Sequence, residues 1–333
     1  MSNRSAQVRD IEAAIFRKLS KFNLSQQHIE YMQYGMVEAS LRGVDTHGVR
    51  LLKCYLKELA GGRSNALPNF ALKKVKAATA VLDADNALGI VAGVTAMNSA
   101  IEIASEQGIG LVTVKNSNHF GAASVYSLQA ARKGFIGISL SNADALISPF
   151  NGTEAMFGTN PISIAAPADN GEFFCLDMAC SQVSYSKVLS HLRESKEVPE
   201  SWMHQSTEEG KPGVLKPLGG YKGAGLAMAV ELLTAALTGS PLDQELSHLY
   251  VPPYNEPRKV SHLMIAIDIS SLIDERIFKG ALHLLLESVR NSQQANDSNL
   301  KILVPGDKEQ TEFIHRTENG IPLEQDTYDL LFN

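Results

Sequence analysis

The feature that most constrains the fold is a regular alternation of short β-branched runs with longer amphipathic patterns, which begins after Pro68. The short runs are bounded by Gly, Asn or Asp, as strands usually are, and the long patterns repeat their apolar residues at helical spacing. Strands are predicted at Ala80–Leu82, Leu111–Val114 and Ile136–Leu140, with helices between them at Gly89–Gln107 and Ala122–Lys133. Such alternation predicts an α/β fold.

The apolar pattern before Pro68 predicts only helices. Apolar residues recur at helical spacing from Val8 to Phe22, Ser25 is a suitable N-cap for a helix through Ala39, and a third helix is expected at Val49–Leu59. Further strands are predicted at Ile162–Ala166, Phe173–Leu176 and Leu263–Ile267, and further helices at Gly223–Leu237 and Glu275–Arg290. We therefore expect a helical N-terminal domain (1–75), an α/β domain (76–300) and a C-terminal segment (301–333).

Composition excludes several classes of protein. Hydrophobic residues make up 44% of the 333 residues, and the formal net charge of −6 argues against binding to nucleic acid. The most apolar stretch, Gly223–Gly239, contains Glu231 and is too short for a membrane span. The three cysteines form no CxxC pair, which favours the cytoplasm, and without HExxH or clustered Cys and His no metal is expected.

Two polar islands contain histidine, whereas the usual nucleotide motifs GxGxxG and GxxxxGK[ST] are absent. In Arg42–Arg50 (RGVDTHGVR), His47 precedes a helix beside an arginine. This arrangement suits a proton donor next to an anion clamp, or else a plain turn between helices. In Asn116–Ala123 (NSNHFGAA), a strand leads into a helix, so the N–H groups of the loop either face an anion or simply form the turn.

Three further islands lie at strand ends or before a helix. Phe157–Pro161 (FGTNP) precedes a strand, and Leu176–Ser181 (LDMACS) ends one. In the latter, Asp177 either orients a histidine or caps a helix. Pro217–Gly225 (PLGGYKGAG) places Lys222 among glycines before an apolar helix, where it either meets a ligand phosphate or is solvated. Loops of this kind carry function on a rigid scaffold.

These islands, in this order, resemble the type-2 malate/L-lactate dehydrogenase family, which also contains ureidoglycolate, sulfolactate and diketogulonate dehydrogenases and piperideine-2-carboxylate reductases. The resemblance extends from Arg42 to Val230 and rests on RGVDTHG, NSNHFGAA, GTNP, LDMA and KGAGLAMAVELL. It implies a non-Rossmann NAD(P)-binding domain with a mixed sheet, joined to the helical N-terminal part. It also implies a homodimer whose cofactor, NAD or NADP, lies in a cleft.

The resemblance implies roles for individual residues. It makes His47 the acid/base, oriented by Asp177 and Thr46, and places His119 near substrate and nicotinamide. In some members of the family, the histidine at the position of His119 is instead considered the group that transfers the proton. The implied substrate-binding residues are Arg50, His119, Thr159 and Asn160. The implied cofactor-binding residues are His119, Phe120, Gly121, Ala122, Ala123, Asp177, Met178, Ala179, Lys222, Pro305, Gly306 and Asp307. Most members separate His-Gly from the arginine by two residues, whereas only Val49 separates Gly48 from Arg50 here.

The expected reaction is hydride transfer between a nicotinamide and C2 of a small 2-oxo or 2-hydroxy acid, with an imidazole supplying or taking the proton. Reduction of a cyclic imine carboxylate is an alternative within the same family. Two alternatives come from other classes, namely a non-catalytic small-ligand binding protein and a hydrolase that uses Thr46, His47 and Asp177. The sequence contains no nucleophile elbow of the GxSxG type, which argues against the hydrolase.

Overall fold

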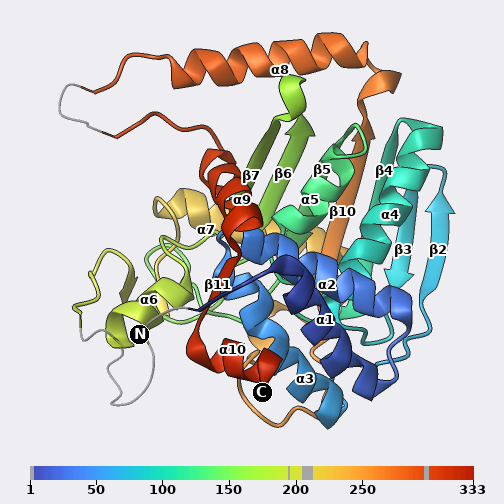
Figure 1. Cartoon of the computed structure of the whole chain (residues 1–333), viewed down its shortest axis with the longest axis vertical. Coiled ribbons are helices and arrows are strands. Elements are labelled where there is room, and N and C mark those ends of the chain that lie inside the picture. Colours follow the sequence, from blue (N-terminus) through green and yellow to red (C-terminus); the bar gives the residue numbers. More distant parts are fainter. Residues whose placement is uncertain (1–3, 194–195, 205–212, 296–299) are drawn as a thin grey trace.

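The computed structural model describes residues 4–193, 196–204, 213–295 and 300–333, and its centre is a seven-stranded mixed sheet (Figure 1). The strand order is β2-β3-β4-β10-β5-β6-β7. These strands are β2 (Ala71–Lys76), β3 (Thr79–Asp83), β4 (Ile109–Ser117), β5 (Phe135–Ser141), β6 (Ile162–Pro167), β7 (Phe173–Met178) and β10 (Val260–Asp268). Within this sheet β3 and β4 are parallel, joined by the crossover helix α4 (Gly89–Gln107), and the other pairs are antiparallel. The predicted α/β fold is confirmed.

Strand β10 lies in the middle of the sheet although it is the last of the seven strands along the chain. It pairs antiparallel with β4 on one side and with β5 on the other. Met264 and Ala266 pack into the core that includes α4, whereas Leu263 and Ile265 pack with helix α7 (Tyr221–Glu231). Because side chains alternate between the two faces of a strand, helices bury this strand on both sides.

Helices α4 and α5 (Ser124–Ala131) pack on one face of the sheet, and the π-helical segment Leu232–Ala236, which continues α7, packs on the other. Helix α2 (Gln26–Leu41) lies over α4 and α5, and its predicted N-cap Ser25 accepts a hydrogen bond from the His28 N–H. The neighbouring helices are α1 (Val8–Leu19) and α3 (Leu52–Gly61). No helix in the described part of the chain is long and apolar enough to cross a bilayer.

The C-terminal residues return to the first helices. Helix α9 (Asp307–Asn319) packs on α2, where Arg316 pairs with Asp45. Strand β11 (Ile321–Leu323) pairs with β1 (Arg4–Ala6), and α10 (Gln325–Phe332) packs on α1. The remaining elements are α6 (Tyr185–Arg193), β8 (Met203–His204), β9 (Val214–Leu215) and α8 (Glu275–Arg290), the last of which crosses the top of Figure 1.

The predicted elements are present with shifted ends. The first helix ends at Leu19, the run at Val49 begins as a 3-10 turn, and the helix expected to reach Leu237 becomes a π-helix at Leu232. Strand β2 was not predicted, because its lysines and its full exposure leave no apolar alternation to read. The sheet therefore starts at Ala71, within the residues expected to form the helical domain.

Asp243 is a buried carboxyl group that joins α7 to the loop before β6. Its Oδ2 accepts hydrogen bonds from the Gly158 N–H and the Asn160 amide, both at 2.8 Å, while its Oδ1 has no partner among the described residues. The Asp243 N–H donates to Glu231 at 2.8 Å. Burial raises the pKa of Asp243 to about 7, against the opposing effect of the two hydrogen bonds, and the Glu231 carboxylate adds to the increase.

We predict that Asp243→Asn stabilises the fold above pH 7 and has little effect near pH 4. An acid with a pKa of about 7 when folded and about 4 when unfolded takes up a proton on folding. Wild-type stability therefore falls as the pH rises between these values, by on the order of a few kcal/mol. Asn keeps an oxygen acceptor and cannot ionise.

Thermal unfolding between pH 5 and 8 checks this prediction, because the Tm difference between variant and wild type should grow with pH. The exposed carboxylate variant Asp326→Asn is the control and should show no such trend. A Tm difference that is the same at every pH would contradict the prediction.

Candidate active site

His47 and His119 come from distant segments and lie face to face. His47 ends the 3-10 turn Asp45–His47 after α2, and His119 lies in the loop after β4. Their ring centroids are 5.8 Å apart with an interplanar angle of 21°. The Thr46 hydroxyl lies 2.8 Å from His47 Nδ1. The structure thus brings together three of the residues expected to act in catalysis.

Both imidazoles are neutral at neutral pH. Burial lowers the pKa of His47 to about 4. Burial, and then the neighbouring His47, lower the pKa of His119 well below its usual value. A neutral imidazole has one nitrogen that donates and one that accepts. The pair is therefore suited to taking a proton from a substrate hydroxyl and to binding the resulting oxygen.

The loop that carries His119 is held tightly against α4. Gly89 begins α4, and a Cβ at this position would lie 2.2 Å from the Asn118 carbonyl oxygen and 2.4 Å from that of His119. Gly121 has a φ of +76° and faces the His47 carbonyl oxygen. Both positions therefore need glycine, one for close approach and one for its backbone conformation.

His262 of β10 packs against this loop. No motif in the sequence marks this residue. It is fully buried, with Nδ1 2.8 Å from the Ser141 hydroxyl and Nε2 2.8 Å from the Ser117 hydroxyl. Phe120 stacks on its ring at 4.6 Å. Burial lowers the pKa of His262 to about 3, so the ring is an uncharged support. In the sequence, the one sign of a special role for His262 is that it is a histidine inside an apolar strand.

Asp177 does not contact His47. Its Oδ2 accepts a hydrogen bond from the Ser124 N–H at 2.9 Å, at the start of α5. No hydrogen bond or ion pair within the described ranges joins it to either histidine of the pair. Partial desolvation by the surrounding protein raises the pKa of the Asp177 carboxyl group, and the hydrogen bonds from Ser124 lower it. Part of the side chain remains accessible to solvent. The structure therefore places the Asp177 carboxylate, at the end of β7, against the N-terminus of α5 and not beside His47.

The other motifs meet at the end of β7. The Cys180 N–H donates to the Thr159 carbonyl oxygen at 2.8 Å, and the Cys180 carbonyl oxygen accepts from the Leu218 N–H at 2.9 Å. The Cys175 N–H donates to the Pro305 carbonyl oxygen at 3.1 Å, so the turn Pro305-Gly306-Asp307 runs along β7. Lys222 is exposed in the first turn of α7. Motifs spread over the whole chain therefore form one continuous region.

Two of the expected substrate-binding residues already have partners. Asn160 is fully buried, and its amide donates to the Ala227 carbonyl oxygen at 3.0 Å and to Asp243. Arg50 lies 3.4 Å from Glu324 in a partly exposed ion pair. Exposed pairs of this kind contribute only about 0–1 kcal/mol, so Arg50 remains available to an anionic ligand.

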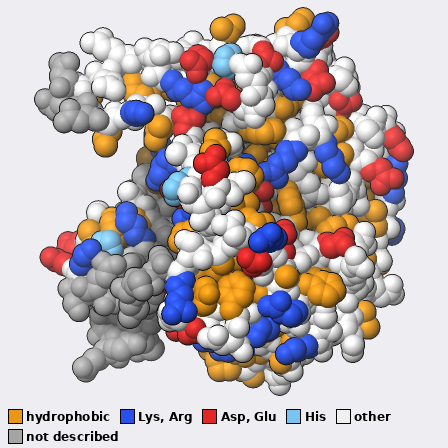
Figure 2. Space-filling view, in the orientation of Figure 1, with side chains coloured by type: hydrophobic (Ala, Val, Ile, Leu, Met, Phe, Trp, Pro, Cys, Tyr) orange, Lys and Arg blue, Asp and Glu red, His pale blue; other side chains and the backbone are white. Residues whose placement is uncertain are grey.

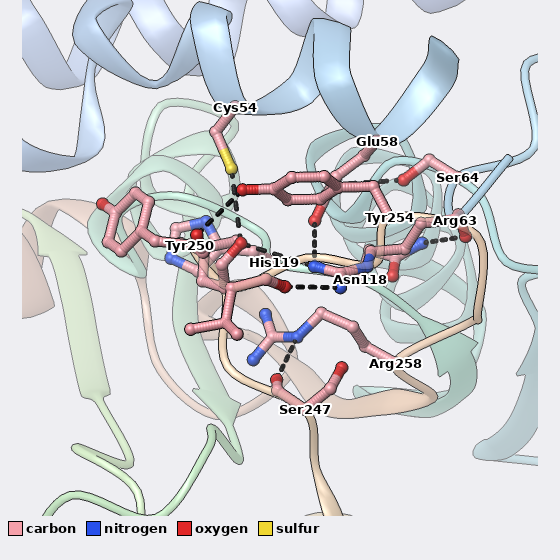
Figure 3. A network of polar contacts seen from close by, with 12 residues as sticks. Cys54, Glu58, Arg63, Ser64, Asn118, His119, Ser247, Tyr250, Tyr254 and Arg258 are labelled. Atoms are coloured by element: carbon pink, nitrogen blue, oxygen red, sulfur yellow. Dashed lines mark hydrogen bonds and ion pairs between the residues drawn. The ribbon is translucent and has the colours of Figure 1, made fainter. Parts of the chain in front are cut away.

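A strap formed by residues 241–259 lies beside the His119 loop and is held by two buried arginines (Figure 3). Arg63 donates to three carbonyl oxygens of the strap, including that of Pro253 at 2.7 Å, and its guanidinium packs on the Tyr254 ring. Arg258 donates to the Ser247 carbonyl oxygen at 2.8 Å and pairs with Asp144. These contacts anchor the strap beside the His119 loop.

The residues at the start of α5 fit a nicotinamide cofactor. No hydrogen bond is recorded within the described residues for the N–H groups of Ala122 and Ala123, which are both buried. Buried N–H groups of this kind need an acceptor, and the oxygens of a dinucleotide would supply one at this helix N-terminus. Gly306 has a φ of +102° and packs closely against Cys175, so this turn lies directly beside β7.

Comparisons with known proteins identify the family of this chain. Residues 6–331 match the profile of the malate/L-lactate dehydrogenase family. The malate dehydrogenase of Pyrococcus abyssi is 34% identical over 332 residues, covering 95% of this chain and 90% of that protein. The ureidoglycolate dehydrogenase (NAD(+)) of Escherichia coli strain K12 is 30% identical over 324 residues, covering 96% and 92%. The solved structure of sulfolactate dehydrogenase from Methanocaldococcus jannaschii has a TM-score of 0.90 at 31% identity, covering 98% of this chain and 95% of that one.

These matches extend over nearly the whole chain and include every motif that forms the site. The chain therefore belongs to the malate/L-lactate dehydrogenase family and is an NAD(P)-dependent oxidoreductase of 2-hydroxy acids.

Proposed function

We propose that this enzyme interconverts a small 2-hydroxy acid and its 2-oxo acid, with His47 as the group that takes and returns the proton. The observation that carries the proposal is the pair of neutral imidazoles, 5.8 Å apart, at the place where the motifs meet. The relatives described above are named for malate, ureidoglycolate and sulfolactate, which share a hydroxyl group on the carbon next to a carboxylate. We extend this shared chemistry to the present chain.

In oxidation, His47 accepts the proton of the substrate hydroxyl, and in reduction it gives the proton back. The bound nicotinamide supplies the acceptor or donor of the hydride at C2. The Thr46 hydroxyl at His47 Nδ1 directs the other nitrogen, Nε2, towards the substrate. The lowered pKa keeps His47 in its basic form before oxidation begins, and the substrate carboxylate favours the imidazolium once the proton has moved.

The remaining residues bind and position the reactants. Arg50 binds the substrate carboxylate, and Thr159 and Asn160 shape the wall next to it, with Asn160 held by Asp243. Asp177 acts through the N-terminus of α5 rather than through His47. The residues that would hold the cofactor are His119, Phe120, Gly121, Ala122 and Ala123 of the loop, Asp177, Met178 and Ala179 at the strand end, Lys222, and the turn Pro305, Gly306 and Asp307.

This assignment gives each part of the chain a role. The helical residues 1–75 contribute His47, residues 76–300 form a non-Rossmann NAD(P)-binding domain, and residues 301–333 return to the cleft and to the helices. The three cysteines are free and buried, as is usual in the reducing cytoplasm where we place the enzyme.

The proposal is tested by nicotinamide absorbance with a panel of 2-hydroxy and 2-oxo acids and one cyclic imine carboxylate, using both NAD and NADP. Wild type should turn over at least one 2-hydroxy acid. His47→Asn should lower kcat by roughly 10²–10⁴-fold at unchanged cofactor affinity, the usual worth of a positioned acid or base. His315→Asn, the same change at an exposed histidine on α9, is the matched control and should keep full activity. Turnover of the imine alone would overturn the proposal, as would a fully active His47→Asn variant.

The low pKa of His47 predicts an unusual pH profile. A base that ionises at about 4 is already unprotonated at neutral pH, so kcat/KM for oxidation should rise through about pH 4 and stay level above pH 5. Initial rates from pH 4 to 8 check this, with recovery of activity at pH 7 as the control for acid unfolding. An acidic limb centred near pH 6.5 would show that His47 is not the base.

We also propose that the enzyme is a homodimer joined through the outer face of α7 and its π-helical continuation. This face exposes Tyr221, Met228, Leu232 and Leu237, each more than half accessible. In Figure 1, α7 lies at the left of the molecule, where Figure 2 shows a deep notch below the segment that carries α8. Contiguous apolar surface of this kind on a folded chain marks a contact with another protein surface, here a second copy.

Sedimentation at micromolar concentration should give twice the chain mass of 36.1 kDa. The double substitution Met228→Glu and Leu232→Glu should halve this mass, because charges would be buried in the contact. Leu67→Glu, a similar change at an exposed leucine before β2, is the control and should leave the mass unchanged. A wild-type mass equal to one chain would rule out the dimer.

A further inference from the structure

The side chain of Tyr55 reaches His119 from α3. Tyr55 is fully buried, and its hydroxyl lies 3.0 Å from His119 Nδ1. The Gly121 N–H also points at this nitrogen, with 3.4 Å between the two nitrogen atoms. Within the described residues no other hydrogen bond is recorded for the Tyr55 hydroxyl. One nitrogen of His119 therefore faces two hydrogen-bonding groups.

These contacts decide which nitrogen of His119 carries the proton. A backbone N–H can only donate, so Nδ1 has to be the acceptor, and the Tyr55 hydroxyl then donates to it as well. A proton on Nδ1 would point at the Gly121 N–H and leave that buried donor without an acceptor. The single proton of the neutral imidazole therefore lies on Nε2.

Burial keeps both groups in these forms. It raises the pKa of Tyr55 well above its usual value, so the hydroxyl keeps its proton. It lowers the pKa of His119 well below its usual value, so the imidazole stays neutral. His47 differs, because its Nδ1 faces the Thr46 hydroxyl, which can either donate or accept. His47 can therefore change its protonation state without losing this bond, whereas a proton on Nδ1 of His119 would break its contact with the Gly121 N–H.

We propose that Tyr55 is a positioning residue that holds His119 as its Nε2–H tautomer, so that His119 donates a hydrogen bond to the substrate oxygen while His47 alone transfers the proton. This inference rests on the function proposed above. In oxidation the O–H bond breaks and its proton goes to His47, the C2–H bond breaks and its hydride goes to oxidised NAD(P), and the C–O bond becomes C=O. His119 keeps its own proton throughout and stabilises the charge that develops on the oxygen.

Neutron diffraction from deuterium-exchanged crystals of the full-length protein tests the tautomer directly and does not depend on activity. Deuterium on Nε2 of His119, and none on Nδ1, is the expected result. Deuterium on Nδ1 would overturn the inference. If no 2-hydroxy acid is turned over, the proposed function fails, whereas the tautomer is decided by the diffraction result.

Variants of His119 separate hydrogen bonding from proton transfer. The side chain of His119→Gln carries an amide N–H near the position of Nε2 but is neither acid nor base at neutral pH. It should retain more kcat than His119→Ala, with an unchanged apparent pKa in the pH profile. A Gln variant as inactive as the Ala variant, together with loss of the pH dependence, would show that His119 transfers the proton.

Tyr55→Phe removes one hydrogen bond and keeps the ring. It should lower kcat by roughly 2- to 13-fold, equivalent to about 0.5–1.5 kcal/mol, at unchanged cofactor affinity and unchanged apparent pKa. Tyr34→Phe on α2 is the matched control, because its hydroxyl donates to the Val125 carbonyl oxygen and not to His119. Equal kcat values for the two variants would contradict the role of Tyr55, and so would a shifted apparent pKa in Tyr55→Phe.

Discussion

The pairing of β10 between β4 and β5 is the constraint on which the site depends. It places His262 between Ser117, at the end of β4, and Ser141, at the end of β5, so that both ring nitrogens are satisfied without any charge. Hydrogen bonds of this kind contribute about 0.5–1.5 kcal/mol each, and a buried polar group left unpaired costs more. Phe120 stacks on this ring, and His119 precedes it in the loop. The position of the second histidine is therefore set by a strand that comes some 140 residues later.

Features that are local in the sequence could be predicted from it. The alternation of strands and helices after Pro68, the Ser25 N-cap and the bounds of α8 follow from periodicity and end signals within short windows. The place of β10 in the sheet could not be predicted, because no local signal records which strands pair over long distances. Strand β2 was missed for a different reason, since an exposed edge strand rich in lysine has no apolar face.

In the candidate site, too, local motifs could be predicted from the sequence, whereas long-range contacts could not. The motifs identified His47 and His119 as candidates, and the structure brings the two rings together. The sequence left two alternatives for Asp177, a cap and an orienting acid, because both need a carboxylate at a strand end. In the structure Asp177 contacts Ser124 at the start of α5. Tyr55 and His262 resemble ordinary core residues in the sequence, so their contacts with the His119 loop could be found only in three dimensions.

The central claim is that a substrate oxygen lies between two neutral imidazoles, one of which transfers the proton while the other holds the oxygen. The most direct measurement is a crystal structure of the enzyme with NAD(H) and an analogue of a 2-oxo acid that cannot be reduced. We expect the C2 oxygen of the analogue, or its equivalent, within about 2.6–3.2 Å of Nε2 of both His47 and His119. An analogue bound away from His47, or with its oxygen out of hydrogen-bond reach of both rings, would contradict this account.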